Sequence, residues 1–428
     1  MQTITPLSAL PDITQPVIID GYTQTIASAN TLTIGDNANL LIELNGANSG
    51  GGIGLHITAG NSTIKGLVIN RFLSGGIQID AGGNTIAGNF IGTDAAGASA
   101  LASQVLGVFV HGSNNIIGGT NAADRNVVSG NGSQGVDISG AAATNNVVQG
   151  NYVGTNKDGT VAINENSFGI LVESGASNNL IGGTTGTTPS GACTGACNLT
   201  SGHAQAGIGV MANTTGNSIQ GNFAGTNITG TAAIPNGVGI FVGTLGGGPP
   251  NSVGGTTAAA RNLISGNTHA GISMQPGGPV TVQGNYIGTE TTGTSALGNN
   301  DGIGAASGTS VPGTSSIIGG ADAGAGNIIA FNGEHGVSVF QSPGSLVPIT
   351  IRGNSIHDND GDLKFAPFFG LGIDLNGDSV TPNDDKDADS GPNNLQNFPV
   401  ITSATLSTEA GIINGTLNST PGQSFTLD

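Results

Sequence analysis

The chain has 428 residues, of which 77 are glycine, while charged residues make up only 8% and aromatic residues 4%. Glycine is more than twice as frequent as in an average protein, yet no Gly-X-Y period is present, which excludes collagen. The formal net charge of −18 argues against a nucleic acid or an anionic membrane surface as partner, because phosphate binding needs clustered lysine and arginine. Divalent cations remain natural partners of so acidic a chain.

Residues 1–60 are expected to form N-terminal coils and strands ahead of the main repeats. Between Met1 and Ile19 there is neither a basic start nor a continuous apolar segment, so no signal peptide is visible. If the protein is secreted, this sequence is a mature or trimmed form. No apolar stretch approaches the roughly 18 residues that a membrane-spanning helix needs, so membrane insertion is not expected.

Residues 61–357 are dominated by internal repeats. The phrase Gly-Asn-[Phe/Tyr]-x-Gly-Thr occurs four times, with spacings of 62, 71 and 63 residues. Two further phrases, Asn-x-[Ile/Val]-Gly-Gly and Arg-Asn-x-[Val/Ile]-Ser-Gly-Asn, recur in the same order. Short strands of the form Gly-[Ile/Val]-x-apolar lie between them. These strands begin at Gly107, Gly135, Gly169, Gly207, Gly239, Gly271, Gly302 and Gly336.

Short strands of period 2, glycine and asparagine corners and the lack of helical periodicity predict an all-β fold, a parallel β-helix solenoid. In this fold each coil pairs with the coils above and below, and inward isoleucine and valine side chains stack into one core. Asparagine before a strand is expected to adopt the left-handed conformation and to form an amide ladder with the next coil. About three turns of roughly 20 residues in each unit would give about 15 to 17 coils and a rod on the order of 75 Å long.

Two repeat positions predict structural roles. Arg125 and Arg261 occupy the same place in their units, where the guanidinium is expected to fix adjacent loops, and Cys197 lies at the corresponding place between them. The aromatic position of the first phrase is expected to form a packing stack, not a series of sugar-binding subsites. It is filled by Phe90, Tyr152, Phe223 and Tyr286.

The two cysteines, Cys193 and Cys197, lie four residues apart in a stretch rich in glycine, threonine and proline. A small loop disulfide is the favoured interpretation. A metal pair is disfavoured, because zinc would need two more ligands nearby. Whether the two sulfurs are paired stays open at this point.

Acidic and basic side chains and a histidine crowd together near the end of the repeats, and these are the candidate catalytic residues. A polysaccharide lyase would use a metal to neutralise a uronate carboxylate and an arginine or lysine to abstract the adjacent proton, whereas an inverting glycosidase would use two carboxylates roughly 6.5 to 9.5 Å apart. The favoured alternative is a solvated loop followed by phenylalanines that cover the end of the core. The candidates are Arg352, His357, Asp358, Asp360, Asp362 and Lys364.

Residues 358–397 are the most charged stretch and are predicted to close the helix and to bind calcium structurally. Alternate side chains of an extended loop can supply several of the six to eight oxygens that calcium takes. Neither half of the stretch is an EF-hand loop, which would carry glutamate at its twelfth position. A loop that starts at Asp374 has Asp385 there, and one that starts at Asp385 has Gln396. The alternative is an acidic turn capped by aspartate side chains. The candidate ligands are Asp374, Asn376, Asp378, Asp384, Asp385, Asp387 and Asp389.

Residues 398–428 contain alternating runs at 398–406, 411–417 and 424–427, which predict a small antiparallel sheet. This C-terminal β segment is interpreted as the possible start of a further β domain. No cap is evident at either end of the predicted rod, and a solenoid needs capped ends. We therefore expect the sequence to be a segment of a longer chain.

The repeated phrases, such as Arg-Asn-x-Ile-Ser-Gly-Asn and Asn-x-Ile-Gly-Gly-Thr, resemble the right-handed parallel β-helix repeats of large secreted bacterial surface proteins. The resemblance covers the chain from about Asn61 to Asn397. In such proteins a stretch similar to residues 370–375 and 395–399 commonly closes the helix before further β domains. The resemblance implies an extracellular or cell-surface location. It implies little about activity, because right-handed β-helices also include pectate lyases, polygalacturonases, alginate epimerases and phage tailspikes.

Two functions from different classes follow from these observations. The leading hypothesis is a non-catalytic extracellular stalk or adhesion module of a bacterial surface or secreted protein, stabilised by calcium near its C-terminus. The rival is a carbohydrate-active enzyme, that is a polysaccharide lyase, glycoside hydrolase or epimerase, or a glycan-binding β-helix, that acts on an extracellular polysaccharide. Self-association through the exposed strand edges of the terminal coils is a third hypothesis.

Overall fold

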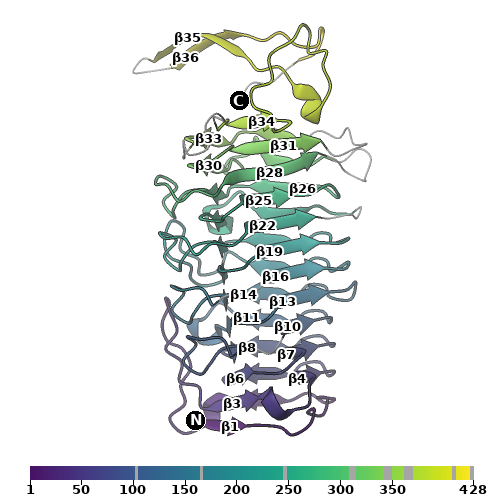
Figure 1. The fold of residues 1–428 in the computed structure, drawn as a ribbon, viewed down its shortest axis with the longest axis vertical. Helices are drawn as coiled ribbons and strands as arrows, with labels where there is room; N and C mark the ends of the chain where they lie inside the picture. The colour runs from purple at the N-terminus through teal and green to yellow at the C-terminus, as the bar shows by residue number, and fades with distance from the viewer. Residues whose placement is uncertain are drawn as a thin grey trace.

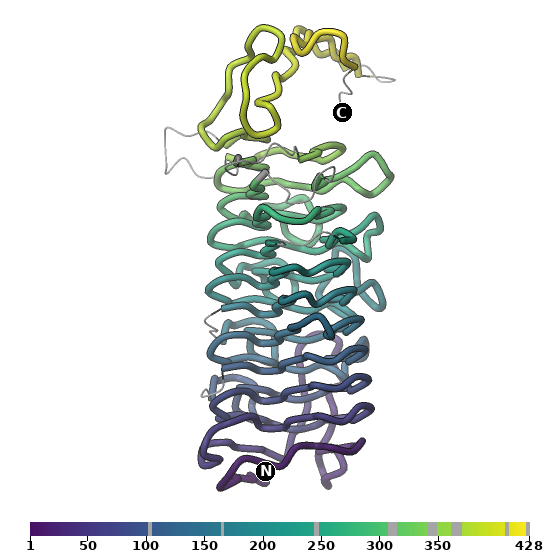
Figure 2. The backbone as a smooth tube through the Cα atoms, turned by 90° about the vertical axis from the view of Figure 1, so that its right-hand side faces the viewer, coloured from purple at the N-terminus to yellow at the C-terminus, as the bar shows by residue number. Residues whose placement is uncertain are grey.

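In the computed structural model the chain forms a rod of stacked coils, with three parallel sheets along its length and a two-stranded antiparallel sheet beyond its C-terminal end (Figure 1). The structure describes residues 1–101, 105–163, 167–243, 248–307, 315–341, 349–360, 370–406 and 411–424. The N-terminus and the antiparallel sheet lie at opposite ends of the rod (Figure 2). The predicted fold class, an all-β right-handed parallel β-helix with a short antiparallel segment, is confirmed.

Sheet A has 12 strands of two to four residues, each paired in parallel with the strands of the neighbouring coils. Because these strands are short, most of a coil in this region is corner and loop. Its strands are β1 (Gln2–Ile4), β3 (Ile42–Asn45), β6 (Leu67–Asn70), β9 (Phe90–Ile91), β12 (Val127–Val128), β15 (Tyr152–Val153), β18 (Leu199–Thr200), β21 (Phe223–Ala224), β24 (Leu263–Ile264), β27 (Tyr286–Ile287), β30 (Ile328–Ala330) and β33 (Ser355–His357).

Sheet B has 11 strands and contains the predicted Gly-[Ile/Val]-x-apolar strands, in the expected order. It is the broadest face of the rod, with strands of up to seven residues. Its strands are β4 (Ile53–Ile57), β7 (Gly75–Ile79), β10 (Leu106–Val110), β13 (Gln134–Ser139), β16 (Phe168–Glu173), β19 (Ala206–Met211), β22 (Val238–Gly243), β25 (Ala270–Met274), β28 (Asp301–Ser307), β31 (Val337–Gln341) and β34 (Ile373–Leu375).

Sheet C closes each coil and also has 11 strands. They are β2 (Ile18–Asp20), β5 (Thr63–Lys65), β8 (Thr85–Ala87), β11 (Ile116–Gly118), β14 (Val147–Gln149), β17 (Leu180–Gly182), β20 (Ser218–Gln220), β23 (Asn251–Gly254), β26 (Val280–Gln283), β29 (Ile317–Gly319) and β32 (Thr350–Arg352). The antiparallel pair outside the rod is β35 (Val400–Leu406) and β36 (Gly411–Thr416).

Helical structure in the described residues is limited to single 3-10 turns. Among these residues, no helix has the length and apolar character needed to cross a membrane. The turns are η1 (Gly21–Thr23), η2 (Gly46–Asn48), η3 (Ala122–Asp124), η4 (Ala258–Ala260) and η6 (Pro392–Leu395).

The rod has fewer and larger coils than the repeat spacing predicted. Its sheets of 12, 11 and 11 strands correspond to about 12 coils, which at about 4.8 Å a coil makes a rod of roughly 50 Å. Strand β12 stands between β9 and β15, so the 62 residues from Phe90 to Tyr152 hold two coils, not three. The estimate from 20-residue intervals was wrong because alternate coils also carry a long loop, such as the one in which Thr93 pairs with Ala100.

The interior of the rod is filled by inward side chains that stack from coil to coil. Ile77, Val108 and Val136 are in register on neighbouring strands of sheet B and are fully buried. They belong to one contiguous apolar core that runs from Leu44 to Ile349. Since one coil has no core of its own, each coil depends on the coils above and below for its stability.

Buried asparagines form ladders along the rod, as the sequence predicted. In each ladder the side-chain amide of one asparagine donates to Oδ1 of the next. The left-handed residues are the neighbours Asn114, Asn145 and Asn178, one position before ladder members. The longest ladder runs through Asn89, Asn126, Asn151, Asn198, Asn222, Asn262, Asn285, Asn327 and Asn354.

Two shorter asparagine ladders run beside the longest one. Their inward amides satisfy backbone carbonyls at the corners, where the strands of a coil change direction. A polar corner in an otherwise apolar interior is stable only when such groups are paired. One ladder contains Asn84, Asn115, Asn146, Asn179, Asn217 and Asn251, and the other contains Asn236, Asn267, Asn299, Asn332 and Asn359.

Candidate functional site

Of the six candidate catalytic residues, the structure describes Arg352, His357, Asp358 and Asp360. Arg352 ends β32 in sheet C, whereas His357 ends β33 in sheet A. Nδ1 of His357 lies 2.8 Å from the carboxylate of the neighbouring Asp358, and Asp360 is exposed. The last two candidates, Asp362 and Lys364, fall outside the described residues. His357 and Asp358 thus form an exposed contact at the end of β33.

The first half of the predicted calcium set is engaged within the protein. Asp374 in β34 is fully buried, and its two carboxylate oxygens accept hydrogen bonds from backbone N–H groups of the turn that follows. One of these oxygens also lies 3.2 Å from Nε2 of His335. Asn376 donates to Asp378 at 2.8 Å. These hydrogen bonds are compatible with the capped acidic turn given as the alternative, and calcium at this half of the set stays a prediction.

The second half of the set brings three carboxylates together. One oxygen from each of Asp384, Asp387 and Asp389 lies within 4.8 Å of the others. One oxygen of Asp389 is buried and has no hydrogen-bond partner in the described part of the chain. Burial and the charges of Asp384 and Asp387 raise the pKa of Asp389. Asp385, in the same loop, is exposed and lies 3.3 Å from Lys386 instead. A hard cation could neutralise the three gathered carboxylates.

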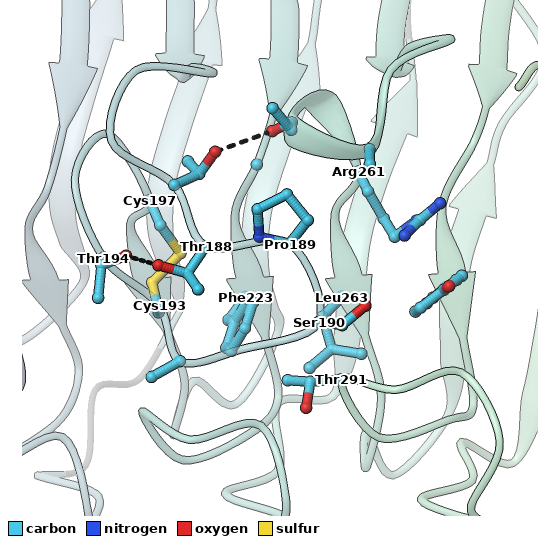
Figure 3. A pocket seen from close by; sticks show the side chains of 16 residues that line it. Thr188, Pro189, Ser190, Cys193, Thr194, Cys197, Phe223, Arg261, Leu263 and Thr291 are labelled. Atoms are coloured by element: carbon cyan, nitrogen blue, oxygen red, sulfur yellow. Dashed lines mark hydrogen bonds between the residues drawn. A yellow bond between two sulfur atoms is a disulfide. The ribbon is translucent and has the colours of Figure 1, made fainter.

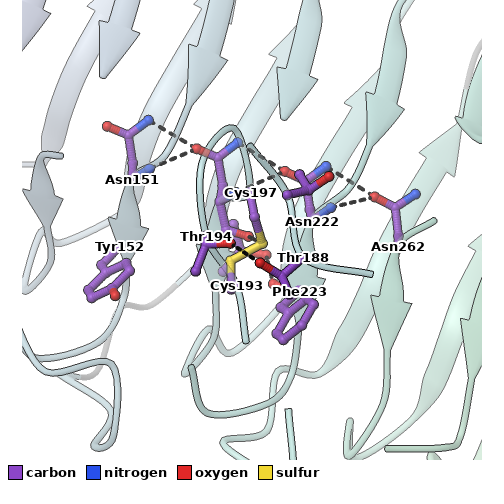
Figure 4. The surroundings of a disulfide bond; sticks show 12 residues. Asn151, Tyr152, Thr188, Cys193, Thr194, Cys197, Asn222, Phe223 and Asn262 are labelled. Atoms are coloured by element: carbon purple, nitrogen blue, oxygen red, sulfur yellow. Dashed lines mark hydrogen bonds between the residues drawn. A yellow bond between two sulfur atoms is a disulfide. The ribbon is translucent and has the colours of Figure 1, made fainter. Parts of the chain in front are cut away.

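The predicted stack forms on the outside of sheet A, but it is a mixed one, because Val127, Leu199 and Leu263 of the intervening coils separate the aromatic residues. Tyr152, Phe223 and Tyr286 belong to one apolar cluster together with the two cysteines, and Phe90 packs in the adjacent cluster. Cys193 and Cys197 are joined by a disulfide and buried against this stack (Figure 4). The disulfide loop thus covers the coil in which Cys197 replaces the arginine of the other units.

Arg125 fixes a distant loop, as its repeat position predicted. Its guanidinium lies over the ring of Tyr152, 4.4 Å from the centroid. The terminal nitrogens donate to backbone carbonyls of Leu32, Thr33 and Gly35. The N-terminal loop is therefore held against the stack more than 90 residues further along the chain.

The outer face of sheet B carries a buried carboxyl group that the sequence reasoning missed. Asp137 in β13 is 5% exposed and lies between Phe109 and Leu171 of the neighbouring strands. One of its oxygens has no hydrogen-bond partner among the described residues. Burial and the nearby charge of Glu173 raise its pKa to about 7. The available signal was an acidic residue between two core residues, Val136 and Ile138, of a predicted strand.

The same face carries a histidine and aspartate network near the N-terminal end. Nδ1 of His56 lies 2.8 Å from Asp12 and Nε2 lies 2.7 Å from Asp80, while Asp80 also contacts Nδ1 of His111 at 2.8 Å. Burial raises the pKa of Asp80, but the hydrogen bonds from His111 and His56 outweigh it and lower the pKa to about 2. The network ties the N-terminal segment to β4, where Ile13 pairs with the strand.

Toward the C-terminal end, the outer face of sheet B is hollowed into a groove of about 370 Å³. Its floor is formed by small residues, and a Cβ at Gly304 would meet no atom within 4 Å. Phe340, 42% exposed, forms a wall. Asp301 at the edge has its pKa raised mainly by burial. The polar lining residues are Ser273, Gln275, Asn300, Asp301 and His269.

The groove borders an apolar patch whose central side chains are buried. Phe168, Leu171 and Ala206 pack on the outer face of β16 and β19, against Val238 and Phe241 of β22. The rings of Phe168 and Phe241 meet edge to face, with centroids 6.4 Å apart. Val238 belongs to both the patch and the groove. The groove itself, with an aromatic side chain and a few converging polar groups, has the composition of a binding site.

Comparisons with known proteins bear on the fold alone. No protein-family model matches the chain. No curated protein matches it either. Among solved structures, the chain is similar to the crystal structure of the Dettilon tailspike protein (gp208), with a TM-score of 0.44 and 19% sequence identity over 93% of this chain and 68% of that chain. The fold assignment rests on the strand pairing described above, and no function is transferred from this similarity.

Proposed function

We propose that the protein is a rigid β-helical rod that works outside the cell as a stalk or binding module of a bacterial surface or secreted protein, without catalysing a reaction. The unbroken asparagine ladders and core support this proposal, because they make each coil continuous with the next. The disulfide between Cys193 and Cys197 fits an oxidising, extracytoplasmic environment. Of the described candidate catalytic residues, Arg352 ends a strand of sheet C and His357 a strand of sheet A, which supports binding over chemistry.

As the binding surface we propose the groove on sheet B, with an uncharged segment of an extracellular glycan as its ligand. The groove offers one aromatic wall, Phe340, for the apolar face of a sugar ring and several amide and hydroxyl groups for its hydroxyls. Its volume of about 370 Å³ falls within the range of pockets that hold small ligands. The open floor at Gly304 leaves space for a ring to lie flat against the sheet.

This proposal predicts retention of the rod by an insoluble glycan without release of product. The chain is incubated with neutral and acidic polysaccharides, and co-sedimentation, new reducing ends and unsaturated uronate absorbance are followed. Gly304→Leu fills the groove and is expected to lower the binding constant about tenfold or more. Phe109→Ala, on the same face but outside the groove, is the control and is expected to bind like wild type. Product release would overturn the proposal that the rod is not catalytic. If Gly304→Leu binds the glycan as tightly as wild type, the proposal that the groove is the binding surface is wrong.

We further propose that calcium binds between Asp384, Asp387 and Asp389. Asp387 also accepts hydrogen bonds from the backbone of Asn397 and the hydroxyl of Ser419, so an ion here would join the end of the rod to the segment after β36. The buried oxygen of Asp389 supports a cation, because no described residue donates a hydrogen bond to it. The role would be structural.

Calcium at about a hundredfold excess over its dissociation constant is expected to stabilise this region by about 2 to 3 kcal/mol. Limited proteolysis of the C-terminal segment and calorimetric titration measure the effect. Asp387→Asn should abolish it, whereas Asp385→Asn, which changes an exposed carboxylate in the same loop, should keep it. A melting temperature and a cleavage rate that do not respond to a chelator would contradict the site.

A further inference from the structure

The rod contains two copies of an arginine stacked on a tyrosine, both on the outside of sheet A. Arg125 precedes β12 and lies over Tyr152 of the next coil, with 4.4 Å between the guanidinium carbon and the ring centroid. Arg261 precedes β24 and lies over Tyr286 of the next coil, at 3.9 Å. The backbone positions are equivalent, so the first copy shows what the second copy is shaped to hold.

In the first copy the two terminal nitrogens of the guanidinium are occupied by the chain itself. The loop between Ser28 and Asn39, closed by the pairing of these two residues, presents three backbone carbonyls to the terminal nitrogens of Arg125. The N–H of Gly35 in this loop donates to the hydroxyl of Tyr152 at 3.0 Å. Arg125 is consequently 4% exposed and Tyr152 1% exposed. This copy shows that the stacked guanidinium binds oxygen acceptors along its outer edge.

In the second copy the same edge is open. Nε of Arg261 donates to the carbonyl of Gly284 at 3.1 Å, which fixes the orientation of the guanidinium. No described residue accepts a hydrogen bond from its two terminal nitrogens or forms an ion pair with it, and the hydroxyl of Tyr286 has no partner among these residues. Both side chains are partly exposed. No counterpart of the N-terminal loop covers them in the described part of the chain.

A small cavity lies beside this open edge (Figure 3). It has a volume of about 30 Å³ and is bounded on one side by the disulfide loop. Such a space holds roughly two water molecules, or a planar group of three atoms, but not a whole peptide loop. Its lining combines hydroxyl groups with apolar carbon and contains no acidic side chain. The lining includes Thr188, Pro189, Ser190, Leu263 and Thr291.

We propose that Arg261 and Tyr286 form a binding site for the carboxylate group of an organic ligand. A carboxylate places two oxygens in the plane of the guanidinium and takes both terminal N–H groups in a charge-assisted, bidentate pair. It also fits the size of the cavity. A phosphate group would carry more negative charge than the single arginine in the lining neutralises. The hydroxyl of Tyr286 and those around the cavity are placed to bond further oxygens of the ligand.

The site is separate from the groove on sheet B and does not depend on the proposed glycan binding there. Its carboxylate could belong to a uronic acid residue or to an acidic peptide, which share the same recognition chemistry. The test follows the side-chain Nε–Hε signals of the arginines in ¹⁵N-labelled protein while acetate, tri-galacturonate and a blocked aspartyl tripeptide are added in turn. Sodium chloride at the same ionic strength is the reference anion.

The expected result is a saturable shift of the Arg261 signal with a carboxylate. The Arg125 signal should not shift, because that side chain is buried and its terminal nitrogens already have acceptors. Arg261→Lys keeps the positive charge but cannot form the bidentate pair with a carboxylate. The dissociation constant of the carboxylate ligand, measured from neighbouring amide signals, should therefore rise about tenfold. Tighter binding of the trisaccharide or of the tripeptide identifies the source of the carboxylate. An equal shift with chloride, an equal shift of both arginine signals, or unchanged binding by Arg261→Lys would overturn the proposal.

Discussion

Replacing Asn222 with alanine is expected to lower the free energy of unfolding by about 3 to 5 kcal/mol, because each buried polar group left without a partner costs about 1 to 3 kcal/mol. The side chain of Asn222 lies in the middle of the longest ladder and is completely buried. Its amide donates to the carbonyls of Ile181 and Gln220 and to Asn262, and its oxygen accepts from Asn198. Alanine removes all of these bonds at once and introduces no replacement.

The measurement is the denaturant midpoint of unfolding, followed by circular dichroism, together with hydrogen exchange along the chain. Because each coil contacts only its neighbours, the loss of protection should be greatest in the coils of β18, β21 and β24. Asn48→Ala is the matched control, since Asn48 is exposed and its side chain makes no hydrogen bond within the described residues, and surface changes of this kind stay within about 0.5 kcal/mol. A variant of Asn222 as stable as the control would show that the ladder does not hold the coils together.

The repeats of the sequence were sufficient to predict the strands and the ladders, but not the number of coils. A strand such as β13 is recognised because Val136 and Ile138 point inward and a glycine corner precedes them. The length of a coil is set by its loops, and the loop after β9 folds back on itself through Thr93 and Ala100 without contributing to any sheet. Loop length has no periodic signal, so the intervals between asparagines were misinterpreted as whole turns.

The sequence predicts candidate sites where functional side chains lie close together along the chain. In a solenoid, side chains that are far apart along the chain can also be in contact, so such sites are not found in this way. Asp384, Asp387 and Asp389 were found because one loop carries all three. Arg261 and Tyr286 belong to different coils, so the sequence gives no sign that they touch. In a parallel β-helix the neighbours of a side chain come from the coils above and below. Their positions in the sequence depend on the same loop lengths that the repeats leave undetermined.

The second large effect is expected at Asp137, where asparagine should make the protein more stable at alkaline pH. Burial and the charge of Glu173 raise the pKa of Asp137 in the folded protein to about 7, from an ordinary value of 3.8. The folded state therefore holds this proton when the unfolded chain has already released it. Below about pH 4 the carboxyl group is protonated in both states and does not lower the free energy of unfolding. As the pH rises toward 7 the free energy of unfolding decreases, and above pH 7 the folded state bears the full cost of burying the charged carboxylate.

The shift of about three pKa units corresponds to an upper limit of about 4 kcal/mol. Asparagine has the shape of the protonated carboxyl but does not ionise, so the difference in unfolding free energy between Asp137→Asn and wild type should be close to zero at pH 4 and grow to several kcal/mol at pH 8. Subtracting the two proteins cancels the titration of the other carboxylates. Denaturant midpoints at pH 4, 6 and 8 give the difference directly.

Glu173→Gln separates the two causes of the raised pKa. It removes the neighbouring charge but leaves Asp137 buried between Phe109 and Leu171. Because burial is the larger cause, Glu173→Gln should recover only a minor part of the stability that Asp137→Asn recovers at pH 8. If Asp137→Asn follows wild type at every pH, the carboxyl group is hydrated in solution. The outer face of sheet B would then open at β13, where the structure has it closed.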